Sequence, residues 1–383
     1  MKSNFQLNLI IILLFTCPFI ETGLSQSIEW QGQAASWLTI NPSPALTGQI
    51  GLRYIPSIFL QKDLNNGYQF NSELSINAYG AGSYIDNRNF DKNGKIKPYR
   101  FWFRFTSSQF ELRAGLQKIN FGSATILRPL MWFDHMDPRD PLQLTDGVYG
   151  LLGRYYFLNN ANIWIWVLYN NDKTKGWEIY PTEKHKPEIG GRVQFPLWTG
   201  EIALTGHHRA VNADGTVQNL DGNTQSVHEN RFALDGKWDA GVGIWFEGVL
   251  TKSDFKIRAL RYTRMLNLGM DYTFDYGNGF HILAEYLRVD ISGEIFNSGR
   301  PSSLAALTMN YPLTLLDNLS AIFYYDWDNR NAYRFLNWQR TYDRWSFYLM
   351  GFWNPKSFQI YQNQADQNLF TDKGFQFMVV FNH

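Results

Sequence analysis

The stretch YRFWFRFT, from Tyr99 to Thr106, alternates without a break between two kinds of side chain. Phenylalanine occupies positions 101, 103 and 105, and the positions between them hold Arg100, Trp102 and Arg104. Successive side chains of a β-strand point to opposite faces, so this pattern predicts a strand with one aromatic face and one charged face. The same alternation recurs in four further segments, which are Phe110–Gln117, Arg231–Asp239, Leu266–Tyr276 and Gly374–Asn382.

The composition indicates where such strands reside. Aromatic residues make up 17% of the chain, yet the mean hydropathy is −0.32 and no long apolar segment follows the N-terminal region. This combination excludes a helical membrane protein and favours a transmembrane β-barrel, whose strands hide their apolar half by alternation. A soluble β-sandwich also alternates, but large aromatics opposite charges favour the barrel. So do aromatics near strand ends, where a barrel has its interfacial girdles: Trp30, Trp37, Trp238, Trp327, Trp345 and Trp353.

The connections predict an all-β fold of eighteen antiparallel strands, with sixteen as the alternative count. Strands are expected to begin near residues 28, 47, 67, 98, 109, 148, 161, 187, 200, 230, 241, 258, 279, 303, 318, 332, 344 and 373. Short turns alternate with longer links at 80–98, 119–147, 170–187, 210–229, 291–302 and 355–372. Short periplasmic turns and long extracellular loops are typical of outer-membrane barrels, and this parity places both termini in the periplasm. We expect one barrel domain over residues 26–383.

The N-terminus predicts export. Lys2 precedes an apolar run from Leu7 to Ile20 and then small residues near Ser25, which is the pattern of a signal peptide over residues 1–25. The alternative makes Cys17, the only cysteine, a lipoprotein anchor. Removal of the signal leaves a chain without disulfides. Lys and Arg total 35 against 34 for Asp and Glu, and this near-balance argues against a nucleic-acid partner.

The faces opposite the apolar ones carry charge and are assigned to the barrel interior. The lumen wall is expected to include Arg100, Arg104, Glu111, Arg154, Glu188 and Arg192, with Arg113, Arg209, Arg231, Lys237, Arg261, Glu201, Asp235, Asp239, Glu247, Asp271, Asp275, Glu285 and Asp326. Burying such a set in a dry core would be prohibitive, so we expect a watered or salt-bridged lumen. Arg100, Arg104, Arg113 and Arg154 form either a basic stripe for anionic solutes or, the favoured reading, a network of pairs with neighbouring carboxylates.

Motifs for catalysis or metal binding are weak. The sequence has no serine-hydrolase elbow, phosphate loop or HExxH pattern. His207 and His208 are adjacent on a strand and point to opposite faces, which disfavours joint chelation. Asp134, Asp137 and Asp140 are conceivable calcium ligands, as are the turns at 212–215 and 221–223, but neither has EF-hand spacing. A barrel lipase would need His208 or His281 beside a serine. We therefore predict no metal, no cofactor and no enzymatic activity.

The segment from Leu112 to Pro141 carries a resemblance. Leu112–Gln117 is followed by Phe121-Gly122, Arg128-Pro129, Asp137-Pro138 and Asp140-Pro141. This order resembles Gram-negative outer-membrane porin-like barrels and is similar to the alginate-export group and its uncharacterised relatives. The resemblance implies a channel in which a proline- and aspartate-rich loop folds into the pore.

These observations predict an outer-membrane channel for passive or facilitated diffusion, or export, of small hydrophilic solutes such as sugars or anions. Residues 119–147 are the expected constriction loop, in which opposite charges create a transverse field and Trp132 or Phe133 offers a sugar-stacking face. The expected constriction residues are Arg113, Arg128, Trp132, Phe133, Asp134, Asp137, Arg139 and Asp140. The expected partners are the outer-membrane bilayer and the solute. The alternative is a non-conducting barrel that anchors an envelope or secretion complex and has a protein partner.

Overall fold

The computed structural model describes residues 26–42, 47–85, 89–213, 227–297, 299, 301–356 and 369–383. The predicted signal peptide and the turn at 221–223 lie outside the described residues, as does the turn at 212–215 from Asp214 onward.

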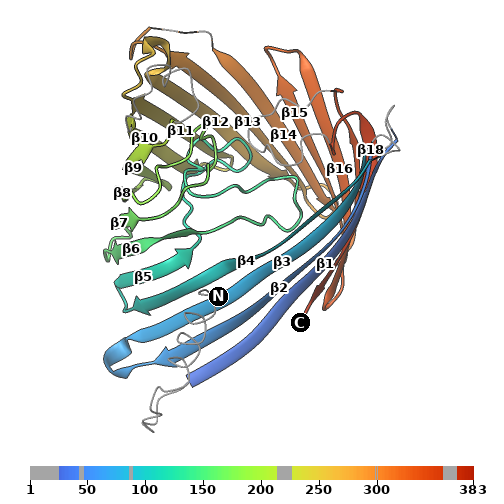
Figure 1. Ribbon diagram of the computed structural model, residues 1–383, viewed down its shortest axis with the longest axis horizontal. Helices are drawn as coiled ribbons and strands as arrows, with labels where there is room; N and C mark the ends of the chain where they lie inside the picture. The colour runs from blue at the N-terminus through green and yellow to red at the C-terminus, as the bar shows by residue number, and fades with distance from the viewer. Residues whose placement is uncertain are drawn as a thin grey trace, which may run out of the picture.

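Eighteen antiparallel strands form a single closed sheet (Figure 1). Each strand pairs with its neighbours in sequence, and β1 closes the ring by pairing with both β2 and β18. The predicted eighteen strands are confirmed, and the alternative of sixteen is wrong. The strands are β1 (Gln26–Asn41), β2 (Thr47–Asp63), β3 (Gln69–Ile85), β4 (Asn89–Thr106), β5 (Phe110–Gln117), β6 (Val148–Tyr156), β7 (Asn162–Leu168), β8 (Glu188–Leu197), β9 (Gly200–Val211), β10 (Val227–Asp239), β11 (Gly243–Ser253), β12 (Tyr262–Phe274), β13 (Phe280–Ser292), β14 (Ser302–Pro312), β15 (Asp317–Asp326), β16 (Asn331–Thr341), β17 (Trp345–Trp353) and β18 (Lys373–Asn382).

In the described segments, single-turn 3-10 helices interrupt two connections, η1 (Asn65–Gly67) and η3 (Arg258–Leu260). Among the residues that the structure describes, no helix is long and apolar enough to cross a membrane. The predicted start of β12 near 258 falls on η3, and the strand begins at Tyr262 instead.

One predicted long link is wrong. The segment 80–98 is not a loop, because β3 continues to Ile85 and β4 begins at Asn89. The two strands stay paired up to this hairpin, with Gly80 opposite Gly94. Glycines and lysines such as Gly80, Gly82, Lys92 and Lys95 hid the strand pattern, because they interrupt the alternation of apolar and polar side chains.

The outer surface carries the predicted apolar faces. Phe101, Phe103 and Phe105 are 42%, 37% and 37% exposed, and Leu266, Leu268 and Met270 are exposed in the same alternating way. Large apolar side chains exposed on the outward faces of the strands need a lipid environment. Trp30, Trp327, Trp345 and Trp353 are also exposed, as expected for a girdle.

Trp37 is an exception to the predicted girdle. It points inward, where its indole nitrogen donates to Gln49 at 2.8 Å and Arg53 lies over its ring.

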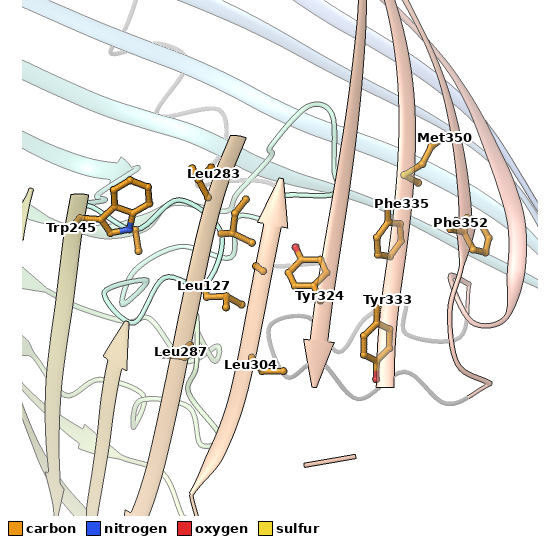
Figure 2. Close-up of a cluster of buried hydrophobic side chains, with 13 residues drawn as sticks. Leu127, Trp245, Leu283, Leu287, Leu304, Tyr324, Tyr333, Phe335, Met350 and Phe352 are labelled. Carbon is orange, nitrogen blue, oxygen red and sulfur yellow. The ribbon is translucent and has the colours of Figure 1, made fainter. Parts of the chain in front are cut away.

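The inner wall has two unlike halves. From β4 to β10 it carries the expected charged residues. From β11 to β17 it is largely apolar apart from Glu247, Glu285 and Asp326, and this apolar character was not predicted from the sequence. Figure 2 shows the apolar half with Leu127, a residue of the β5–β6 connection, packed against it. The wall residues of this cluster are Trp245, Leu283, Leu287, Leu304, Ala306, Tyr324, Tyr333, Phe335, Met350 and Phe352.

Candidate pore constriction inside the barrel

The connection between β5 and β6, residues 118–147, runs inside the ring of strands (Figure 1). Its prolines remove backbone donors and prevent it from continuing as a strand. Its central residues are almost fully enclosed: Ile119, Leu127, Leu130 and Met131 are each at most 1% exposed. We call this segment the inner loop.

Carboxylates of the opposite wall hold the inner loop by its backbone. Glu285 on β13 accepts from the backbone N–H groups of Thr125 at 2.6 Å, Ile126 at 3.1 Å and Leu127 at 2.5 Å. Glu247 on β11 accepts from the N–H groups of Ala124 at 2.7 Å and Leu130 at 3.1 Å. Backbone N–H groups buried away from water need such acceptors, so these contacts fix the loop across the lumen.

A third wall residue completes this attachment. Asn267 on β12 donates from its side-chain nitrogen to the carbonyl oxygen of Leu127 at 2.8 Å. Three neighbouring strands thus bind one short piece of the inner loop. We call Glu247, Asn267 and Glu285 the wall clamp.

The aromatic residues of the inner loop pack into the charged half of the wall. Phe121, Trp132 and Phe133 form edge and stacked contacts with Trp166 of β7 and His207 of β9. Trp132 is 4% and Phe133 2% exposed. The expected sugar-stacking face is therefore wrong for this conformation, because both rings are covered by protein.

The charges of the inner loop pair largely with one another. Arg128 donates to both oxygens of Asp134 at 3.2 Å, and both residues are buried. Arg139 binds both oxygens of Asp137, at 2.6 Å in the shortest contact. Asp140 accepts from the backbone N–H groups of two later loop residues, and burial raises its pKa. Such pairs stiffen the loop.

The carboxylates of Asp134, Asp137 and Asp140 do not converge to form a calcium site. Asp134 is bound to Arg128 and Asp137 to Arg139, while Asp140 caps backbone N–H groups. Within the described ranges, no group of three or more potential ligand side chains converges on a metal position.

A second connection, residues 169–187, also folds inward and interlocks with the inner loop. The indole nitrogen of Trp177 donates to the carbonyl oxygen of Arg128 at 2.8 Å. The backbone N–H of Gly176 donates to the carbonyl oxygen of Asp134 at 2.9 Å. The sequence predicted this link as a loop but gave no indication that it enters the lumen.

Buried ion pairs attach the second connection to the wall. Lys175 contacts Glu188 at 3.1 Å, and Glu178 contacts both Arg209 and Arg231 at 3.0 and 2.7 Å. Burial of a lone charge is prohibitive, so buried charges on the wall need partners of opposite charge. The charged residues of the predicted loop at 170–187 were therefore the feature of the sequence that could have predicted these contacts.

The predicted lumen residues lie on strands and have differing partners, except Arg261 and Asp275, which lie just before and just after β12. Arg113 and Arg154 share Glu111, and Arg192 pairs with Asp235 at 2.6 Å. Glu188 binds Lys175 and His207 rather than an arginine. Arg100 donates to the carbonyl oxygen of Thr145 and so anchors the base of the inner loop. Arg104 stacks on Trp102.

The two histidines considered for catalysis have other contacts. His208 bonds to Asn230 at 2.9 Å and stacks on His228, and His281 bonds to Thr273 at 3.1 Å. Neither ring is hydrogen-bonded to a serine of the described chain.

A closed antiparallel barrel with a lipid-facing apolar exterior and a charged interior is an outer-membrane β-barrel protein. Solved structures of outer-membrane porins share the fold. OccAB4 of Acinetobacter baumannii matches with a TM-score of 0.54 and 9% identity, over 93% of this chain and 98% of that one. OccK7 of Pseudomonas aeruginosa matches with a TM-score of 0.53 and 8% identity, over 93% and 99%.

OmpF of Salmonella typhi, solved with daunomycin, matches with a TM-score of 0.50 and 10% identity, over 93% of this chain and 97% of that one. At these identities the likeness concerns the fold alone. No protein-family model matches the sequence, and no curated protein matches it.

Proposed function

We propose that this barrel is an outer-membrane channel for small hydrophilic solutes, in which the inner loop forms the constriction. The observation that carries the proposal is the charged half of the inner wall, from β4 to β10. Charged side chains that face a lumen need ion-pair partners or water, because a dry interior would penalise each lone charge by several kcal/mol. On β5 and β6, Arg113 and Arg154 share the single carboxylate of Glu111, so this part of the wall needs water.

Two further observations support the proposal. The fold is shared with solved porins, and the Leu112–Pro141 segment resembles porin-like barrels and the alginate-export group. The constriction would be set by the inner loop and its charges, with Arg113 on the adjacent wall. Because Trp132, Phe133, Arg128 and Asp134 are covered, solutes would meet the partly exposed Asp137, Arg139 and Asp140 there.

Recording in planar bilayers tests this function. Purified wild-type barrel is expected to give discrete conductance steps, and deletion of residues 125–143 is expected to give larger ones. Deletion removes the piece held by the wall clamp while keeping both ends of the loop. If neither protein conducts although both are folded, the channel function is refuted.

The second candidate is a non-conducting barrel that anchors an envelope complex. The interlocking of two inward connections, with Trp177 bound to Arg128, favours it. This function predicts that the wild type stays closed and co-purifies with a protein subunit. Passive transport predicts solute flux without any partner. Both candidates are non-enzymatic, and neither requires a metal or cofactor.

A further inference from the structure

Three arginines on neighbouring strands lie side by side on the inner wall, near the end of the barrel that carries the short turns. Arg104 of β4 is the direct cross-strand partner of Arg113 of β5. Arg154 of β6 stands opposite Glu111, two residues along β5 from Arg113. All three side chains remain partly exposed to the lumen. We call Arg104, Arg113 and Arg154 the arginine row.

Negative charge beside the arginine row is scarce. Among the described residues, Glu111 is the only carboxylate in ion-pair contact with it, at 2.8 Å from Arg113 and 3.5 Å from Arg154. The guanidinium group of Arg104 has no ion pair or hydrogen bond within the described part of the chain. Glu73, on the adjacent strand β3, is hydrogen-bonded to Trp102 and Ser75 instead. Two guanidinium groups thus share one carboxylate, and the third has none.

This arrangement is unfavourable for the wall by itself. Like charges directly opposite each other on paired strands are destabilising, and Arg104 and Arg113 occupy such a pair. The Nε–H group of each arginine in the row is also buried without an acceptor in the described structure. A wall built only for rigidity would place a second carboxylate here, as it does at Arg209 and Arg231, which share Glu178 and Glu229.

Aromatic rings orient the arginine row from behind. The guanidinium carbon of Arg154 lies 3.8 Å from the ring centroid of Trp164. Those of Arg113 and Arg104 lie 4.9 and 5.6 Å from the ring of Trp102. Stacking of this kind holds a guanidinium plane in a fixed orientation while its terminal nitrogens stay available.

We propose that the arginine row is a binding subsite for small solutes that carry a carboxylate or phosphate group. The terminal nitrogens of arginine form a planar fork that matches both groups. An anion there would relieve the repulsion between Arg104 and Arg113. The inference rests on the proposed channel function and adds a substrate class to it.

The subsite lies at the short-turn edge of the constriction, and Arg113 belongs to both. Arg104, Arg113 and Arg154 each lie within four residues of a short turn, whereas the inner loop leaves β5 at its other end, after Gln117. An anion would thus meet the arginine row on the short-turn side of the constriction, which the parity of the connections assigns to the periplasm.

The test compares ion selectivity of the full barrel and of single variants in planar bilayers under a KCl gradient. Arg104→Gln is the principal variant, because Arg104 has no ion-pair partner whose loss would disturb the wall. The wild type is expected to prefer anions, and Arg104→Gln is expected to lower the anion-to-cation permeability ratio about threefold, as removal of one charge about 5 Å from a permeating ion in water predicts. Glu111→Gln is expected to raise the ratio.

Lys237→Gln is the matched control. Lys237 also points inward near the short turns, on β10, but it lies outside the row. If Lys237→Gln lowers the ratio as much as Arg104→Gln, selectivity reflects general lumen charge and the subsite is refuted. Correct folding of each variant is checked by its heat-modifiable mobility on gels.

Liposome swelling distinguishes the ligand chemistries. Gluconate and glycerol phosphate are compared with neutral arabinose, and Arg104→Gln is expected to slow the two anions relative to arabinose. Slowing of one anion alone assigns the subsite to that group. Equal rates in wild type and variant overturn the inference but leave the channel intact, whereas absence of all flux refutes the channel itself.

Discussion

Replacement of Glu285 by alanine should release the inner loop. Glu285 accepts hydrogen bonds from three consecutive backbone N–H groups, those of Thr125, Ile126 and Leu127, at 2.5 to 3.1 Å in the shortest contacts. Alanine provides no acceptor, and the enclosed position of the loop keeps water from replacing the carboxylate. The barrel itself should persist, because the strand pairing of β13 does not depend on this side chain.

The expected effect follows from two opposing contributions. Each buried N–H group that loses its acceptor costs about 1–3 kcal/mol. Removal of a buried carboxylate returns part of this, because its own desolvation penalty is several kcal/mol. A net loss of about 2–4 kcal/mol remains, which shifts the equilibrium between docked and released loop about 30-fold to 1,000-fold. Glu285→Gln keeps one oxygen acceptor and should lie between wild type and alanine.

Two measurements check this expectation. Ala124→Cys places a thiol where the side chain is 6% exposed, so the rate of labelling by a bulky maleimide reports loop release. Labelling should be faster in the Glu285→Ala background, and single-channel recordings should show more frequent large openings. Glu201→Ala is the matched control, since Glu201 faces inward but bonds to Gln194 rather than to the loop. Unchanged labelling and conductance in folded Glu285→Ala would refute the clamp.

Three further outcomes are expected. Burial acts to raise the pKa of Asp146, but the hydrogen bond and charge of Lys97 outweigh it and hold that pKa below the usual 3.8. Their contact therefore stabilises the base of the loop above about pH 4 and is lost as the pH falls through the lowered value. Current fluctuations are therefore expected to increase in acid, and Asp146→Asn should remove this pH dependence. Trp132→Ala should destabilise the loop by about 3–5 kcal/mol through loss of buried contacts, seen as faster labelling of Ala124→Cys. Leu234→Arg, on the lipid face, should weaken folding into vesicles by about 2–4 kcal/mol in urea titrations, and an unaffected midpoint would contradict the outward assignment.

The exterior and the strand count could be predicted from sequence because lipid requires an apolar residue at every second position. Phe101, Phe103 and Phe105 satisfy this requirement within one strand, and turn residues mark its ends. The apolar half of the interior could not be predicted. Where a strand is apolar on both faces, as at Tyr324 and Tyr325, the alternation that identifies the inner face disappears.

The inner loop could be located but its contacts could not. Prolines and aspartates marked residues 119–147 as irregular, and Glu247 and Glu285 were expected to face the lumen. Their partners are backbone N–H groups, which every residue except proline carries, so no side-chain pattern announces them. Trp132 and Phe133 were misassigned for a related reason. The sequence pattern of an aromatic residue in a loop is the same whether its ring contacts solute or packs against protein.

The wall clamp also bears on how the barrel is made. The inner loop follows β5, whereas its acceptors lie on β11 and β13, more than a hundred residues later in the chain. Before β11 and β13 are synthesised, the backbone N–H groups of the inner loop lack these acceptors and Leu127 lacks its packing partners on the wall. Glu247 and Glu285 can accept from the loop only when β11 and β13 come to lie opposite it. Docking of the loop can therefore be completed only after β13 has been synthesised. Truncations that end before β13 should leave the inner loop without the acceptor Glu285 and open to cleavage by added protease.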